Sequence, residues 1–411
     1  TMPVQLRSQP VYPSKEAWTA PDVYDFSQLD ERMAVTLAAR PDAYVFPRLN
    51  IGVPPWWLKE NPEAICKYDN GKGQLVDCEE FGHPVPSWAS PKYRAAVKEG
   101  LRRLIAHVEA SSYADRIIGY HLASGTTEEW MFWGSNDENL CDYSEPARQA
   151  FRDWVRARYP TVEALRAAYE HPTVTHDLIE PPSRNARVAS AFGALREPQR
   201  ERVPLDYFKF LSDLVADTIT DFATTVKELT GHTKTVGVFY GYVLELSGGG
   251  RLQNGGHLAI ERVLRCPDID FVCSPSGYAY RQPGGEGVSY FMSALGSVQL
   301  HGKLWFDEND IQTTLSKSPP GWQGKPDSLD LDLRQQDKEL AHVLTEGVGQ
   351  WWFDVCGNRY DEPRLMQHLA GWVKAANLAR AADRTPVDDV AFVLDPQSMP
   401  HLQVNGPMSY S

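Results

Sequence analysis

The stretch that decides the fold is RIIGYHLASGTTEEW, residues 116–130. Residues 116–122 form a short and mainly apolar run, which predicts a buried strand, and residues 125–130 then turn polar and acidic. Buried strands of this kind pair in parallel when helices cover both faces of their sheet. The stretch therefore predicts an α/β fold in which polar side chains gather where a strand ends.

The same unit recurs, because short apolar strands alternate with longer amphipathic helices. Apolar runs predict strands at residues 42–47, 116–122, 235–240, 269–273, 303–306 and 349–353. Helical spacing predicts helices at residues 29–39, 93–110, 146–158, 161–169, 207–229, 258–265, 288–298, 329–345 and 363–382. No strand runs into a G-x-G-x-x-G or P-loop motif, so a nucleotide-binding doubly wound sheet has no support. The alternation favours a TIM-type (β/α)8 barrel, whose active sites lie at the carboxyl ends of its strands.

The pattern divides the chain into three segments. Residues 1–25 form a Pro-rich N-terminal segment without a convincing strand, and residues 26–383 form the barrel. Residues 384–411 change character and begin a second α/β domain, with a strand at 387–394, that this chain does not complete. Only strands three to eight of a barrel are readable, so the chain is a fragment or has strands that the pattern does not reveal.

Composition and charge argue against several classes of partner. The 411 residues include 41 Lys plus Arg against 54 Asp plus Glu, a formal net charge of -13, with no basic run. Nucleic acid and anionic membranes are therefore poor partners. No stretch approaches the roughly 20 apolar residues of a membrane-spanning helix. The N-terminus lacks the layout of a secretion signal, which leaves localisation open with a slight preference for the cytoplasm.

Aromatic residues are frequent near the predicted strand ends. With 12 Trp and 18 Tyr, the chain has many side chains that stack on the C–H faces of sugar rings, although large enzymes also use aromatics in their cores. The 6 cysteines include no C-x-x-C pair and no Cys/His cluster at zinc spacing, so we expect mostly reduced core or loop residues. Cys66 and Cys78 flank a Gly-rich loop and would pair only in an oxidising compartment.

Carboxylates at the strand ends are the candidates for chemistry. A retaining glycosidase needs two carboxyl groups about 5–5.5 Å apart, one as nucleophile and one as general acid and base. On a barrel these come from different strands. The carboxylates that follow predicted strands are Glu128, Glu129, Glu245, Asp307, Glu308, Asp310 and Asp354.

The order of these motifs resembles clan A of the glycoside hydrolases, most closely the family 42 β-galactosidases and their relatives. Residues 118–122 resemble the strand-four approach to the acid/base, and residues 303–308 the strand-seven approach to the nucleophile. The resemblance implies a retaining mechanism with Glu129 as acid/base and Glu308 as nucleophile, without a metal or organic cofactor. It also implies a β-galactoside among the β-linked sugars as substrate, and residues 387–394 as the first strand of the domain that follows the barrel.

One residue departs from the family pattern. Clan A enzymes usually have Asn directly before the acid/base, where it contacts the substrate 2-hydroxyl, but here Glu128 precedes Glu129 after Gly-Thr-Thr. This leaves open which of the two glutamates is the acid/base, and both could be solvated loop carboxylates. We favour Glu129, because Trp130 would desolvate it and raise its pKa as an acid requires.

Glu308 follows its apolar strand directly, in the segment Asp307-Glu308-Asn309-Asp310. A nucleophile must stay ionised, and hydrogen-bond donors such as Tyr278 or Asn309 would favour the charged form. The resemblance gives Tyr278 the place of a tyrosine after strand six that contacts the nucleophile. The alternative for Tyr278 is a loop aromatic that packs on the barrel rim.

Sugar binding is predicted for aromatic and polar residues near the strand ends. The resemblance and the chemistry point to the aromatic residues Trp57, Trp133, Tyr240, Tyr242, Trp305 and Trp352, some of which we expect to be core residues. The polar candidates are Arg48, Asn50, His121 and His257, and Glu128, Tyr278 and Asn309 complete the set.

Other functions remain compatible with the sequence. The chain could be a carbohydrate-binding barrel without activity, or a β-glycosidase of other specificity, such as for fucosides, mannosides or uronides. A metal-dependent isomerase or hydrolase on the same barrel would need clustered His and carboxylate ligands, and the 11 His show no such spacing. Family 42 enzymes are often oligomeric, so the resemblance is compatible with a homo-oligomer that binds an oligosaccharide or glycoside.

Overall fold

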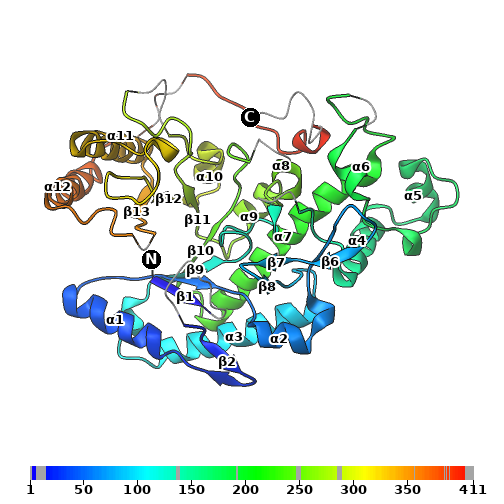
Figure 1. The fold of residues 1–411 in the computed structure, drawn as a ribbon, viewed down its shortest axis with the longest axis horizontal. Coiled ribbons are helices and arrows are strands. Elements are labelled where there is room, and N and C mark those ends of the chain that lie inside the picture. Colours follow the sequence, from blue (N-terminus) through cyan, green and yellow to red (C-terminus); the bar gives the residue numbers. More distant parts are fainter. Residues whose placement is uncertain are drawn as a thin grey trace. The chain divides into compact units, whose positions relative to one another are not determined.

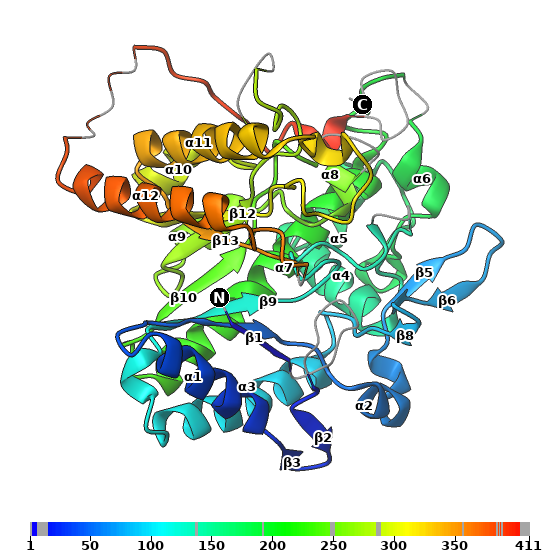
Figure 2. The same ribbon diagram turned by 60° about the vertical axis from the view of Figure 1, so that its left-hand side comes forward.

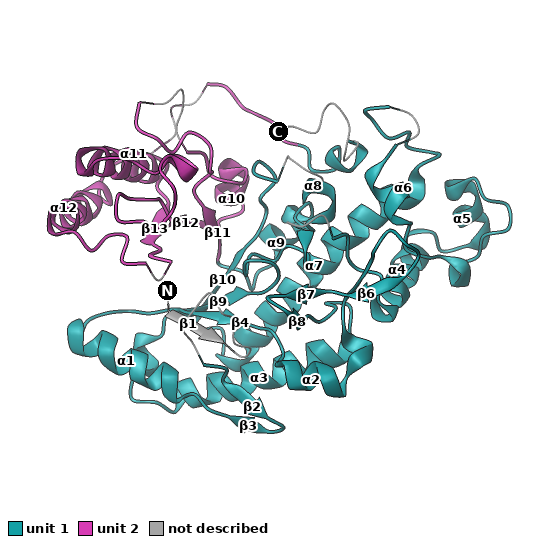
Figure 3. Cartoon of the chain, in the orientation of Figure 1, with its two compact units in different colours: residues 1–270, 395–411 teal, residues 271–394 magenta. Residues whose placement is uncertain are grey.

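The computed structural model describes residues 2–5, 15–135, 139–190, 193–246, 251–284, 289–355, 357–383, 385, 387 and 389–402. The chain divides into two compact units, shown in different colours in Figure 3. Unit 1 comprises residues 1–270 and 395–411, and unit 2 comprises residues 271–394. Each unit is built on parallel strands joined by helices, as the sequence pattern predicts.

Among its described residues, unit 1 contains four parallel strands in the order β1, β4, β9, β10. They are β1 (Met2–Gln5), β4 (Pro47–Asn50), β9 (Gly119–Ala123) and β10 (Thr235–Phe239). Every residue of β4 and β9 is buried, as expected for a parallel sheet covered on both faces. β9 and β10 approach so closely that a Cβ at Gly119 would lie 2.0 Å from the Thr235 side-chain oxygen, so this position requires glycine.

Two long helices pack against this sheet because each has an apolar face. Helix α3 (Pro91–Glu109) starts at Ser90, whose side chain accepts a hydrogen bond from the backbone N–H of Tyr93, and buries residues such as Leu101 and Leu104. Helix α7 (Arg202–Leu229) buries most of one side along its 28 residues. Figures 1 and 2 show α7 running beside α3 and along β9 and β10.

The other elements of unit 1 lie in the connections between strands. Its shorter helices are α1 (Ser27–Ala39), α2 (Pro55–Glu60), α4 (Glu145–Arg158), α5 (Val162–Tyr169), α6 (Arg184–Val188), α8 (Arg251–Asn254) and α9 (Ile260–Arg265). Its hairpins are β2 (Trp18–Ala20) with β3 (Val23–Tyr24), β5 (Lys67–Asp69) with β6 (Leu75–Asp77), and β7 (Glu79–Glu80) with β8 (His83–Pro84). The last two hairpins follow β4, so they belong to the strand-end side where active-site residues are expected.

Unit 2 contains three parallel strands in the order β11 (Phe271–Pro275), β12 (Leu304–Asn309) and β13 (Gly349–Trp352). Its helices are α10 (Leu295–Leu300), α11 (Leu329–Glu346) and α12 (Pro363–Ala379). Helices α11 and α12 pack side by side through a small core that includes Leu340, Leu365 and Leu369 (Figure 2). Among the described residues of the whole chain, no helix combines the length and apolarity needed to cross a bilayer.

Most predicted helices and strands are confirmed with shifted ends, but the first strand is misplaced. Within residues 42–47, Val45 forms only an isolated bridge with Ile117, and β4 begins at Pro47. Tyr44 is 64% exposed, whereas Arg48, at 4%, is buried as part of the sheet. The apolar run misled the prediction because the buried strand residues here include polar side chains. β1 is a strand that the Pro-rich N-terminal segment did not reveal.

Two further predictions are wrong. The helix predicted at 288–298 is limited to α10, because the described residues before it pair with the end of β11: Gly277 N–H donates to the Tyr290 carbonyl at 2.7 Å. The strand predicted at 387–394 does not form among the described residues there, and the Phe392 side chain is 88% exposed. Arg196 N–H then donates to the His401 carbonyl at 2.7 Å, which attaches this end of the chain to unit 1. A second domain beginning at residue 384 stays a prediction.

Candidate active site

The acid/base candidate Glu129 lies on a tight loop that follows β9. Four residues of this loop, Gly125, Thr127, Glu128 and Trp130, have positive φ angles of 81°, 57°, 67° and 58°. Left-handed backbone is uncommon for residues other than glycine, and it persists only where surrounding contacts hold it. The loop is therefore a special local structure that strand periodicity could not predict.

Three residues contact Glu129 and orient it. The Tyr242 hydroxyl donates to Glu129 Oε1 at 3.0 Å, and the Thr127 hydroxyl donates to Oε2. The His257 ring nitrogen Nε2 lies 3.0 Å from the Glu129 carbonyl oxygen. Glu129 is itself only partly buried, so its carboxyl group is both positioned and accessible.

His257 joins the loop after β9 to the loop after β10. Its Nδ1 accepts hydrogen bonds from the backbone N–H groups of Gly241 and Tyr242, both at 3.1 Å. Because Nδ1 accepts, Nε2 carries the proton and donates to the Glu129 carbonyl. Burial lowers the pKa of His257 to about 3, so the ring is neutral at ordinary pH. The structure gives this predicted sugar ligand a buried position between two loops.

Glu128 is in a different environment from its neighbour. Its side chain is 2% exposed, and its Oε2 lies 2.9 Å from the Arg48 Nε in a buried ion pair. The Asn50 amide donates to the other oxygen at 2.8 Å. A carboxyl group that is buried and held by these two partners is poorly placed to reach the oxygen of a leaving group. This arrangement brings three predicted substrate-binding residues together and favours Glu129 as the acid/base.

Trp130, which is expected from the sequence to desolvate Glu129, packs in the core. Its indole N–H donates to the Leu122 carbonyl at 3.0 Å, and its ring packs on Trp88 and Phe222 in the core. Its ring contacts are therefore with core aromatics, whereas the oxygens of Glu129 receive the hydroxyls of Tyr242 and Thr127.

In unit 2, the nucleophile candidate Glu308 lies near the end of regular strand β12. It is 3% exposed, and the indole N–H of Trp351 donates to its Oε2 at 3.0 Å. Glu308 and Trp351 are register partners on β12 and β13, so their side chains lie on the same face of the sheet. Trp351 is a functional candidate that the sequence reasoning missed. Its place opposite Glu308 is set by the register between β12 and β13, which the sequence of neither strand displays.

The residue before Glu308, Asp307, lies on the opposite face of β12 and is fully buried. The Ser276 hydroxyl donates to both Asp307 oxygens at 3.0 Å, and the Gln350 amide donates to Oδ2 at 3.0 Å. Burial raises the pKa of Asp307 to about 7, despite these hydrogen bonds. A buried carboxyl group that keeps its proton through the acidic range therefore lies directly behind the nucleophile candidate.

The two donors expected for Glu308 have other partners. The Tyr278 hydroxyl donates to Asp310 Oδ2 at 3.4 Å, and the Arg281 guanidinium lies 4.2 Å from the centre of the Tyr278 ring. The Asn309 amide donates to Gln336 Oε1 at 3.0 Å on the helix side of the sheet. Asn309, one residue beyond Glu308 on a strand, points to the other face, so its expected contact with Glu308 is corrected. The contact between Tyr278 and Glu308 stays a prediction.

Several predicted sugar ligands are packed in the two cores. Trp133 donates to the Pro86 carbonyl and Tyr240 to the Gly256 carbonyl, while Trp305 packs on Phe291. Trp57, at 9% exposure, and His121, at 0%, are also buried. Trp352 is half-buried: it donates to Gln336 and lines a pocket of about 540 Å³ beside α12. Tyr242 is thus the predicted aromatic residue with a direct contact to Glu129.

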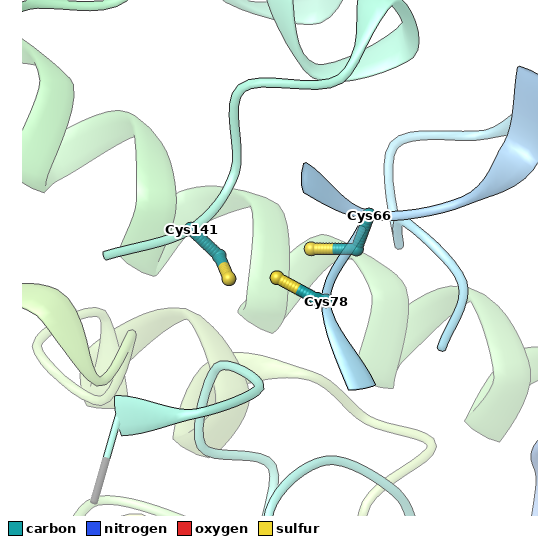
Figure 4. Close-up of side chains that lie close together, drawn as sticks. All are labelled: Cys66, Cys78 and Cys141. Atoms are coloured by element: carbon teal, nitrogen blue, oxygen red, sulfur yellow. The ribbon is translucent and has the colours of Figure 1, made fainter. Parts of the chain in front are cut away.

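Three thiols from distant parts of unit 1 point toward one another (Figure 4). The Sγ atoms of Cys66, Cys78 and Cys141 lie within 4.8 Å of one another and are buried, and no disulfide joins the described cysteines. Burial raises the pKa of Cys66 and Cys78 well above the usual range. Burial also opposes ionisation of Cys141, but hydrogen bonds from the other two thiols bring the pKa of Cys141 down to about 6.

This thiol cluster brings together three cysteines that are far apart or unpaired by motif in the sequence, and all three are reduced core residues, as expected. Three buried thiols, one of which ionises readily, have the chemistry to hold a soft metal ion such as Zn²⁺. Sequence spacing could not reveal the cluster, because Cys66 and Cys78 flank a hairpin and Cys141 comes after the Glu129 loop. Cys356 lies outside the described residues.

Parallel strands with glutamates near their ends are typical of (β/α)-barrel glycoside hydrolases, the class of protein to which the family comparison also points. The model of glycoside hydrolase family 42, described as beta-galactosidase, matches residues 17–247. The chain belongs to this family.

A curated relative agrees with this assignment. The chain is 22% identical over 396 residues to beta-galactosidase BbgII of Bifidobacterium bifidum, a match that covers 91% of this chain and 51% of the relative. The chain therefore spans about half the length of that relative.

Solved structures confirm the predicted barrel fold. The catalytic domain of a beta-amylase from Paenibacillus polymyxa has a TM-score of 0.63 at 12% identity, over 91% of both chains. A beta-galactosidase from Bacillus circulans has a TM-score of 0.57 at 16% identity, over 92% of this chain and 51% of that chain. At these identities the likeness shows the fold alone, which is the TIM barrel.

Proposed function

We propose that the chain is the catalytic barrel of a retaining β-glycosidase that acts on β-galactosides, with Glu129 as general acid and base and Glu308 as nucleophile. Family membership supports glycoside hydrolysis. The observation that carries the choice of residues is the contrast between neighbouring carboxyl groups: Glu129 is accessible and oriented, whereas Glu128 is enclosed in an ion pair with Arg48.

The contacts of Glu308 suit a nucleophile. An indole N–H at 3.0 Å stabilises the charged form of a carboxylate and fixes the position of its Oε2. The buried acid behind it, Asp307, has its pKa raised to about 7 and adds little negative charge to the site below that pH. A second full charge beside Glu308 would favour protonation of the nucleophile, which this arrangement avoids at mildly acidic pH.

The proposed reaction proceeds in two displacements. In the first, the Glu308 carboxylate forms a bond to the anomeric carbon while the glycosidic C–O bond breaks, and Glu129 gives its proton to the leaving oxygen. In the second, Glu129 takes a proton from water, whose oxygen attacks the anomeric carbon and releases Glu308. Two inversions give net retention.

The acid/base assignment is tested by the leaving-group dependence of the Glu129→Ala variant. We expect kcat/KM to fall about 100-fold or more for a β-galactosyl disaccharide, and much less for 2,4-dinitrophenyl β-galactoside, whose leaving group needs no proton. Glu261→Ala, a substitution at an exposed position on α9, is the control and should change neither substrate's rate. An equal loss on both substrates, or this behaviour in Glu128→Ala instead, would overturn the assignment.

A further inference from the structure

The β7–β8 hairpin carries an exposed aromatic residue on a strained turn. Phe81 and Gly82 form the two-residue tip between Glu79–Glu80 and His83–Pro84, with φ angles of 53° and 76°. Two positive φ angles are the geometry of a type I′ hairpin turn, which favours Asn or Gly at the position that Phe81 occupies. The Phe81 ring is nevertheless 48% exposed, so core packing does not account for it.

The base of this hairpin is firmly held. Cys78 N–H donates to the Cys66 carbonyl at 2.8 Å, Val85 N–H to the Cys78 carbonyl at 3.0 Å, and Cys66 N–H to the Val85 carbonyl at 2.9 Å. The Cys66 and Cys78 side chains belong to the buried thiol cluster, together with Cys141. The hairpin therefore projects from a fixed base, and its tip has a defined position.

The hairpin reaches the loop of the acid/base candidate. Glu80, directly before Phe81, accepts a hydrogen bond from the backbone N–H of Thr127 at 3.4 Å. The Thr127 hydroxyl in turn donates to the Glu129 carboxylate. One residue, Thr127, thus separates the Glu129 carboxylate from the hairpin strand that precedes Phe81.

We infer that the β7–β8 hairpin forms the binding site for the leaving group, in which the Phe81 ring stacks on the sugar or aryl ring that departs from the glycoside. This inference rests on the proposed function. An acid/base contacts the leaving oxygen, so the ring attached to that oxygen lies on the acid/base side of the bond being broken. The exposed Phe81 ring, one residue beyond the Glu80 that contacts the Glu129 loop, offers an apolar face to the C–H face of a sugar. The Glu80 carboxylate beside it can accept hydrogen bonds from hydroxyl groups.

The test compares two substrates in the Phe81→Gly variant of the full chain. Glycine adopts the turn without strain, so removal of the ring should leave the melting temperature unchanged or slightly raised. We expect kcat/KM for a β-galactosyl disaccharide to fall about threefold to tenfold, the loss of one stacking contact, mainly through KM. Hydrolysis of β-galactosyl fluoride, which has no ring on the leaving side, should be unchanged.

Two further variants complete the design. Phe81→Tyr keeps an aromatic ring and should retain the disaccharide rate, and Leu75→Ala, at a 46% exposed position in the neighbouring β5–β6 hairpin, is the control and should have no effect. Equal rates for Phe81→Gly and the unmodified protein on the disaccharide would overturn the inference, as would an equal loss on the fluoride. Absence of hydrolysis of both substrates by the unmodified protein would instead reject the proposed function.

Discussion

Each candidate catalytic glutamate follows directly after a buried acid, but the two acids are held in opposite ways. Glu128 in unit 1 is paired with the Arg48 guanidinium at 2.9 Å. Asp307 in unit 2 is hydrogen-bonded by the neutral groups of Ser276 and Gln350, and its pKa is raised to about 7. One buried acid is therefore compensated by a cation, and the other is compensated by keeping its proton.

The difference reflects the local backbone. Glu308 lies on a regular strand, where alternation alone separates it from Asp307 and points the two side chains to opposite faces. Glu129 lies on a loop with left-handed backbone, where strand alternation does not apply. Its separation from Glu128 depends on distant side chains: Arg48 on β4 binds Glu128, and Tyr242 after β10 binds Glu129. The acid/base region thus depends on distant side chains, whereas the nucleophile region depends mainly on the sheet. Replacing the buried carboxyl group by an amide should therefore change the stability of the protein in opposite directions in the two regions.

The largest effect is expected for Glu128→Gln, which removes a buried charge without changing the size of the side chain. It leaves the Arg48 guanidinium buried without its carboxylate, which costs about 3–5 kcal/mol in comparable pairs. We expect a large fall in the free energy of unfolding, measured by urea denaturation, together with weaker activity because the Glu129 loop loses its support.

The double variant Arg48→Met/Glu128→Gln is the control. Removing both charges should recover most of the lost stability, because no unpaired charge remains. A single Glu128→Gln variant as stable as the unmodified protein would show that the ion pair does not hold this loop.

A smaller and pH-dependent effect is expected for Asp307→Asn. Because the pKa of Asp307 is about 7 in the folded chain and near 4 when unfolded, only the unfolded chain releases this proton between pH 4 and 7. Asp307 therefore lowers the free energy of unfolding progressively as pH rises through that window, by up to about 4 kcal/mol. Asparagine does not ionise, so the variant should be close to the unmodified protein at pH 4 and more stable at pH 8.

Melting temperatures measured from pH 4 to pH 8 check this prediction. The comparison with Glu128→Gln is informative, because that variant should remain destabilised at pH 8, where Asp307→Asn is stabilised. A constant difference between Asp307→Asn and the unmodified protein across this range would contradict the neutral state of the buried Asp307.

The fold could be predicted from the sequence to a large extent because its signal is local. Apolar runs such as residues 235–240 and the long apolar face of residues 207–229 are buried for reasons that the chain itself displays. The prediction is wrong where contacts with distant parts of the chain determine whether a segment forms a strand. β4 is built partly from buried polar residues, and residues 387–394, although apolar, have no neighbouring strand among the described residues.

For the candidate site, the sequence predicts the two glutamates better than the residues that support them. Glu308 follows from its strand, and Glu129 from its position after β9, but their supporting residues do not. His257 was expected to bind sugar, yet its two ring nitrogens contact backbone groups of distant loops. Trp352 was chosen in place of Trp351 because an apolar strand without alternation gives no sign of which side chain shares a face with Glu308. Tertiary hydrogen bonds of this kind leave no periodic trace in the sequence.

The most direct test of the central claim is to identify the residue that becomes covalently attached to substrate. A 2-deoxy-2-fluoro-β-galactoside with a good leaving group should inactivate the enzyme, because the fluorine slows release of the glycosyl-enzyme. Mass spectrometry of the digested protein should then find one sugar per chain, attached to Glu308. A sugar attached to Glu129 or to any other residue, or turnover by Glu308→Ala at the unmodified rate, would contradict the account.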